Sequence, residues 1–200
     1  MKKRITTIVL LIIGSLFIPM MTVKAADGSL NTQAVFQVNG KLLSLSKTPS
    51  FHFGEVNLSE VAKGNDRIQL QSGKDNQLQV TNYDPDVAQW SVDVQATDFK
   101  DDKGKVLSGA QLSLTPDQAT NDENQTDIQS MNVVDIIGSS ATILLGQALG
   151  TTSVSFDQSK NAVLDLSNVD TNAIDEDDTY TSTVQWTLSS QAKAPAASTY

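Results

Sequence analysis

Apolar and polar residues alternate with a period of two in several parts of the chain. The alternation covers residues 34–38, 78–81, 90–97, 152–156 and 180–189. Successive side chains of a β-strand point to opposite faces of the sheet, so each segment is predicted to bury one face and expose the other. No segment after residue 25 keeps apolar residues at helical spacing for three turns. The pattern therefore predicts an all-β protein with antiparallel sheets.

Short polar turn sequences separate the predicted strands. They contain Asn-Gly at 39–40, Asp-Pro-Asp at 84–86 and Asp-Lys-Gly at 102–104. These residue types favour tight turns, since Gly and Asn tolerate left-handed backbone and Pro fixes its own φ angle. Many short strands joined by such turns are typical of a β-sandwich.

Three polar segments interrupt this pattern. Residues 115–129 are almost wholly polar, which predicts a long surface loop. Residues 170–178 form an acidic run just before the last predicted strand. The end of the chain, residues 191–200, consists largely of Ala, Ser and Pro and is predicted to be loosely held.

The first 25 residues resemble a secretory signal peptide. Basic residues at 2–4 precede an apolar run from Ile8 to Ile18, and small residues at Val23 and Ala25 suit cleavage after Ala25. The alternative is an uncleaved membrane anchor, although the run is short for a membrane span. We therefore expect a secreted protein with one domain at residues 26–190, a tail at 191–200, and no membrane span after cleavage.

Composition and charge exclude several classes of protein. The chain has 200 residues, with 14 Lys and Arg against 23 Asp and Glu, a net charge of −9. Removal of residues 1–25 takes away four basic residues and no acidic one, which leaves −13. Nucleic acid requires a basic surface, so it is not expected as a partner. With no cysteine and a single histidine, His52, we expect no disulfide, no metal site and no cofactor.

Two tryptophan tripeptides lie 96 positions apart on alternating segments: Trp90-Ser91-Val92 and Trp186-Thr187-Leu188. Their flanks include Phe-His-Phe-Gly at 51–54, Gln-Val-Thr-Asn at 79–82, Ala-Thr-Asp-Phe at 96–99, residues 107–114, and Gly-Gln-Ala-Leu-Gly at 146–150. Together these sequences resemble the WxL domain of cell-surface proteins from low-GC Gram-positive bacteria, in which residues 51–54 correspond to an early strand. Two features depart from the family pattern: Val92 stands in place of leucine, and the acidic run 170–178 is long.

The resemblance implies an immunoglobulin-like β-sandwich that attaches non-covalently to peptidoglycan in the cell wall. It also implies a membrane-anchored partner, the WxL-interacting protein, and association with other WxL proteins. On this chain the expected motif or binding residues are Trp90, Val92, Tyr180, Trp186 and Leu188. The resemblance further implies a cell-surface protein without enzymatic activity.

The two tryptophans have two candidate roles. Aromatic faces stack on sugars and fill partner pockets, so both residues are candidates for a binding platform. Trp90 shares its strand face with Val92, and Trp186 shares its face with Leu188. Because such an apolar face is expected to be buried, the pattern favours tryptophans that anchor the core.

The sequence supports no particular catalytic residue. His52 lies between Phe51 and Phe53 and is expected to face solvent, and no Gly-x-Ser-x-Gly motif accompanies it. A pair of carboxylates for glycoside hydrolysis could be drawn from Asp84, Asp86, Asp98, Asp135 and Asp165. Nothing in the sequence selects two of them, so hydrolysis of glycans is the least favoured function.

The acidic runs at 98–102 and 170–178 could bind Ca²⁺ through carboxylate oxygens. Neither run has the spacing of an EF-hand loop, so we predict solvated acidic surfaces instead.

The negative charge also limits the attachment mechanism. Gram-positive walls are anionic, so we expect attachment through short-range contacts rather than long-range attraction. A strand edge near residues 180–189 is a candidate docking site for a partner by strand addition, with the loop 115–129 at its rim. The alternative function is a carbohydrate-binding adhesin for host or plant glycans, in which an exposed Tyr83 would contact the sugar.

Overall fold

The computed structural model describes residues 37–38, 41–71, 76–174 and 177–194. The predictions for the signal peptide (1–25), the turn at 39–40, residues 34–36 of the first predicted strand and residues 195–200 of the tail lie outside this part of the chain.

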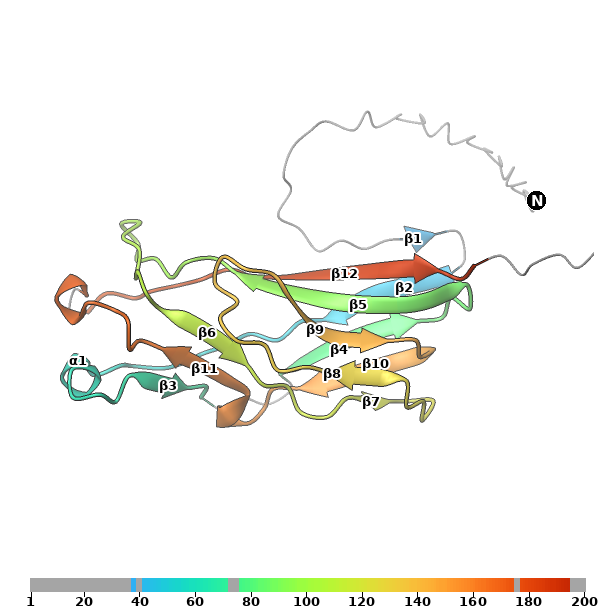
Figure 1. Ribbon diagram of the computed structural model, residues 1–200, viewed down its shortest axis with the longest axis horizontal. Helices are drawn as coiled ribbons and strands as arrows, with labels where there is room; N and C mark the ends of the chain where they lie inside the picture. Colours follow the sequence, from blue (N-terminus) through green and yellow to red (C-terminus); the bar gives the residue numbers. More distant parts are fainter. Residues whose placement is uncertain (1–36, 39–40, 72–75, 175–176, 195–200) are drawn as a thin grey trace, which may run out of the picture. The chain divides into compact units, whose positions relative to one another are not determined.

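The described residues form three antiparallel sheets (Figure 1). The first, ordered β1-β2-β4-β10-β7, contains β1 (Gln37–Val38), β2 (Lys41–Lys47), β4 (Gln77–Asn82), β10 (Gly150–Ser155) and β7 (Thr120–Asn121). The second, ordered β3-β11-β6, contains β3 (Arg67–Gln69), β11 (Ala162–Asp165) and β6 (Gln111–Leu114). The third, ordered β12-β5-β9-β8, contains β12 (Val184–Ala192), β5 (Val87–Ala96), β9 (Ala141–Gly146) and β8 (Ile128–Ser130). The helices are α1 (Leu58–Val61) and the 3₁₀ turns η1 (Ser159–Asn161) and η2 (Thr171–Ala173).

The inward faces of the first and third sheets supply one apolar core. Leu78 and Val80 from β4 are fully buried, as are Val92 and Val94 from β5. A second, smaller cluster lies against the sheet β3-β11-β6, where Leu164 packs with loop residues. The all-β, antiparallel sandwich predicted from the alternation is confirmed.

The last strand begins and ends later than the alternation predicts. Tyr180 to Thr183 are not part of β12, which starts at Val184. Instead, Thr181 and Lys100 exchange two backbone hydrogen bonds of 2.8 Å, while Tyr180 packs against the smaller apolar cluster. The strand continues to Ala192, so residues 191–192, predicted to be loosely held, pair with β5.

The polar segment 115–129 contains more regular structure than predicted. It holds β7 and the first two residues of β8, where a long loop was expected. The side chain of Asn121 explains part of the order, because its Nδ2 donates to the Leu149 carbonyl at 2.9 Å and its Oδ1 accepts from the Glu123 N–H at 2.9 Å. In this segment, hydrogen bonds from polar side chains hold the backbone in place of apolar packing.

The segment at 51–54, expected to be a strand from its resemblance, contains no strand. Among the described residues, its backbone makes one backbone hydrogen bond, which the Gln71 N–H donates to the His52 carbonyl at 2.8 Å. Phe51 and Phe53 still pack against the core, and His52 is exposed as the sequence predicts. The alternation of Phe51, His52 and Phe53 therefore separates partly buried from exposed side chains here without adding a strand to a sheet.

One member of the acidic run 98–102 is not a solvated residue. Asp101 is only 7% exposed, and its Oδ1 accepts from the N–H groups of Lys103 (2.9 Å) and Lys105 (2.7 Å). The carboxylate holds the turn at 102–104 in place, whereas Asp98 and Asp102 face solvent.

Candidate functional site

The two tryptophan motifs lie on neighbouring antiparallel strands of the third sheet. Strands β5 and β12 run side by side in Figure 1. Leu188 pairs with Val92, so the third residues of the two motifs are direct cross-strand partners. Trp186 pairs with Val94 on one side of this pair, and Trp90 pairs with Ser190 on the other. Both tryptophans therefore point to the inward face of one sheet.

Trp90 is a core residue with a specific hydrogen bond. It is 1% exposed, and its Nε1 donates to the Ala148 carbonyl at 3.2 Å. The same carbonyl accepts from Nδ2 of the buried Asn82 at 3.1 Å. A Cβ at Gly146 would overlap the Trp90 ring, so the glycine makes room for the indole. The flanking sequences 79–82 and 146–150 thus converge on the first tryptophan.

Trp186 is half-buried and belongs to an aromatic cluster. Its ring centroid lies 6.2 Å from that of Phe156 and 6.4 Å from that of Phe51. Phe51 and Phe156 meet edge to face at 5.6 Å. Phe51 comes from the Phe-x-Phe-Gly segment, so this segment supports the second motif through its side chains.

The outward face of the motif strands carries amide and hydroxyl groups. These side chains are Gln89, Ser91 and Gln95 on β5, and Gln185, Thr187, Ser189 and Gln191 on β12. The carboxylate on this face belongs to Asp93, whose Oδ1 accepts from Oγ1 of Thr142 at 2.6 Å. Apart from Asp93, the outward side chains of the two strands are neutral hydrogen-bonding groups.

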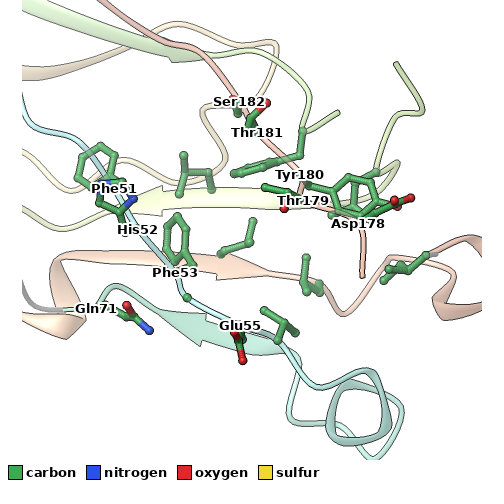
Figure 2. A pocket seen from close by; sticks show the side chains of 18 of the residues that line it. Phe51, His52, Phe53, Glu55, Gln71, Asp178, Thr179, Tyr180, Thr181 and Ser182 are labelled. Carbon is green, nitrogen blue, oxygen red and sulfur yellow. The ribbon is translucent and has the colours of Figure 1, made fainter. Parts of the chain in front are cut away.

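A cleft of about 1340 Å³ lies at the start of β12. It is bounded by residues 49–59 on one side and 177–184 on the other; Figure 2 shows Phe53 and Tyr180 from these two segments. Apolar residues such as Leu112 and Leu164 line it. The hydroxyl of Tyr180 is buried and has no hydrogen-bond partner among the described residues.

The charged residues that line the cleft are acidic. They are Glu55, Asp177 and Asp178, and no Lys or Arg is among the described lining residues. Asp178 pairs with Lys103 at 3.2 Å, and this hydrogen bond raises the pKa of the lysine above its ordinary value. The cleft is thus apolar within, and Glu55 and Asp177 make its rim acidic.

Three of the carboxylates considered for catalysis accept local hydrogen bonds. Oδ1 of Asp84 accepts from the Asp86 N–H at 3.0 Å, and Asp135 accepts from Nε2 of Gln111 at 3.2 Å. The pKa of Asp165 is lowered chiefly by hydrogen bonds from Ser167, so this carboxyl does not suit a general acid. Within the described ranges, no three acidic or histidine side chains form a group that could hold a metal ion.

Two groups of contacts were not anticipated from the sequence. The hydrogen bonds from Trp90 and Asn82 to Ala148 join segments that are far apart in the chain, and periodicity carries no information on such pairs. The alternation predicts a strand at 152–156, but β10 ends at Ser155, and nothing in the sequence indicates that Phe156 meets Trp186. The flanking similarity at 79–82 and 146–150 is a signal for the contacts of Ala148, but Phe156 lies outside the similar flanks.

The fold and the paired motifs define a β-sandwich binding domain. The WxL domain surface cell wall-binding family matches residues 25–191. The chain belongs to this family and is a surface protein that binds the cell wall, as its motifs indicate. No curated protein and no solved structure matches the chain. Of the helices in the described residues, none is long and apolar enough to cross a membrane.

Proposed function

We propose that the protein is secreted, has no enzymatic activity and attaches non-covalently to peptidoglycan. It acts in a surface complex with a membrane-anchored WxL-interacting protein. The observation that carries the proposal is the match to a cell wall-binding family over residues 25–191. The sequence of residues 1–25, with its basic start and apolar run, supports secretion.

The outward face of β5 and β12 is the proposed contact with the wall polymer. The net charge of −13 after residue 25 opposes attraction to an anionic wall. Amide and hydroxyl side chains can instead exchange hydrogen bonds with the hydroxyl and acetamido groups of a glycan. Gln95 and Gln185 are cross-strand partners near one end of this face and present two amides together.

Purified peptidoglycan sacculi, with and without teichoic acids, test the proposal directly. We expect the mature protein to sediment with both preparations. The double variant Gln95→Ala/Gln185→Ala should bind roughly tenfold more weakly, equivalent to about 1.4 kcal/mol. The control, Gln79→Ala/Ser153→Ala, removes the same kind of groups from the outward face of the first sheet and should retain binding. A protein that stays in the supernatant with both preparations contradicts the proposal.

We base the proposed absence of catalysis on the hydrogen bonds that three of the candidate carboxylates accept. Asp84, Asp135 and Asp165 each hold a neighbouring backbone or side-chain donor. Incubation with sacculi or plant glycans should therefore release no reducing sugar. If the wild-type protein releases reducing sugar and an Asp135→Asn variant does not, the protein is a hydrolase instead.

A second candidate function rests on Tyr83. This side chain is 56% exposed and precedes the turn at 84–86, where its ring can stack on a sugar. If the protein is an adhesin, it should bind host or plant glycans, and Tyr83→Phe should bind while Tyr83→Ala should not. Loss of sacculus binding in Tyr83→Ala would instead assign this ring to the wall-binding surface.

A further inference from the structure

β12 is an unusual edge strand. It has nine residues and pairs, within the described chain, with β5 alone. The other edge strands of the three described sheets, β1, β7, β3, β6 and β8, have two to four residues each. β2 extends past β1, but a register shift interrupts it and Lys47 ends it. Short length, irregular register and lysine all discourage pairing with another chain, and β12 contains no charged residue and no proline.

The orientation of the backbone groups on β12 follows from hydrogen bonds at its two ends. The Thr183 N–H donates to Oγ1 of Thr97 at 3.0 Å, and the Thr183 carbonyl accepts from the Thr97 N–H at 3.0 Å. Past the other end, the Lys193 N–H donates to the Asp86 carbonyl at 2.7 Å. Backbone polar groups alternate sides along an antiparallel strand. The even-numbered residues from 184 to 190 therefore direct their N–H and C=O groups away from β5.

The side chains of the same residues leave an apolar row incompletely covered. Val184, Trp186 and Leu188 point inward but are only half-buried. Their neighbours Val92 and Val94 on β5 are 0% exposed. A strand added beside β12 would complete the hydrogen-bond ladder and cover this row at the same time.

The surroundings of β12 indicate which charge the added strand should carry. The cleft at its first residues has an apolar floor, and Glu55 and Asp177 make its rim acidic, whereas Asp178 there is paired with Lys103. A second copy of the chain is a poor occupant, because each copy carries a net charge of −13 after residue 25 and β12 offers no positive charge. A strand in which apolar residues alternate with basic residues fits both the apolar row and this negative charge, because its basic side chains point to the face opposite the row.

We infer that β12 binds an extended segment of a partner protein by strand addition, and that apolar and basic residues alternate in this segment. The inference rests on the proposed surface complex and names the site and chemistry by which a protein partner is held. The apolar side chains of the segment cover Trp186 and Leu188. Its basic side chains point to the opposite, outward face, where the net negative charge of the protein favours them.

A synthetic nine-residue peptide, in which lysine alternates with valine and leucine, tests the inference on the full mature protein. We expect saturable binding by calorimetry, together with a blue shift of tryptophan emission. Trp90 is already buried, so the shift should come from Trp186 and disappear in Trp186→Phe while the heat of binding remains. The same peptide with glutamate in place of lysine should bind at least about tenfold more weakly.

Two matched controls separate strand addition from simple charge attraction. N-methylation of every valine and leucine keeps the side chains and the charge but removes the donors that face β12, so this peptide should not bind. Ser190→Pro removes an N–H from the unpaired edge and should weaken binding roughly tenfold, whereas Ser190→Ala should bind normally. Both variants are first compared by circular dichroism.

Several outcomes would overturn the inference. Equal binding of the N-methylated peptide, unaltered binding by folded Ser190→Pro, or no binding of the parent peptide at about 1 mM would each do so. A dimer in sedimentation that Ser190→Pro dissociates would make a second copy the occupant. Sedimentation with sacculi keeps the two proposals apart. A wild-type protein that sediments with sacculi but does not bind the parent peptide contradicts strand addition alone. Ser190→Pro should lose peptide affinity and still sediment with sacculi.

Discussion

At the scale of single residues, the two tryptophans of the motifs have different environments. Trp90 lies in the core, where its Nε1 donates to Ala148. Trp186 is half-buried on an edge strand and contacts Phe51 and Phe156. Similar tripeptides therefore place their tryptophans differently: the first is enclosed in the core, and the second packs against its margin.

Trp90→Ala should destabilise the protein more than Trp186→Ala. Loss of a buried indole and its hydrogen bond should cost about 3–5 kcal/mol, whereas loss of a half-buried ring should cost about half of that. Urea unfolding followed by circular dichroism measures both values. Equal losses of unfolding free energy in the two variants would show that burial does not distinguish them.

Gly146→Ala tests the close contact beneath Trp90. The added methyl group overlaps the indole, and overpacking of this kind costs about 1–3 kcal/mol. If the contact is the cause, Gly146→Ala should cost much less in a Trp90→Phe background, where the ring is smaller. Additive free energies of unfolding in the double variant would place the strain elsewhere.

At the scale of elements, the alternation predicts strands well where a sheet has one buried face. β4, β5 and β10 fall within or close to the predicted ranges because their apolar residues line the core. The alternation fails where side chains leave the sheet, as at Tyr180, or where polar side chains supply the bonding, as at Asn121. Such contacts depend on tertiary partners that a local pattern does not contain.

Hydrogen exchange should reveal the edge character of β12. Amides of Gln185, Thr187 and Ser189 bond to β5 and should exchange slowly, whereas those of Trp186 and Leu188 should exchange faster. Residue-resolved NMR measurements would show this alternation. The added alternating peptide should slow the fast set alone, and uniform protection before its addition would mean that β12 is already paired on both sides.

At the scale of the whole molecule, charge is the main constraint on attachment. The residues after position 25 carry −13, yet the outward face of β5 and β12 bears one carboxylate, Asp93, which is bonded to Thr142. The sequence predicted short-range attachment from net charge alone. It did not predict that neutral residues of two strands 96 positions apart would share one face, because that requires the register of β5 and β12.

Wall binding should therefore not weaken when salt is added. Between about 0.05 and about 0.5 M NaCl, screening reduces repulsion between the protein and an anionic wall. Retention on sacculi that contain teichoic acids should stay constant or rise, while retention on sacculi without them should change little. A steep fall with salt would indicate a cationic contact surface.

The pairing of β5 with β12 also sets the order of folding. A chain emerges from the ribosome with its N-terminus first, so β5 is present long before residues 184–192. Until then one edge of β5 has no neighbouring strand, and pairing over so long a separation is slow. Completion of the second motif is therefore a late folding step, and a chain cut short before it would lack the Trp186 row and the edge beside it.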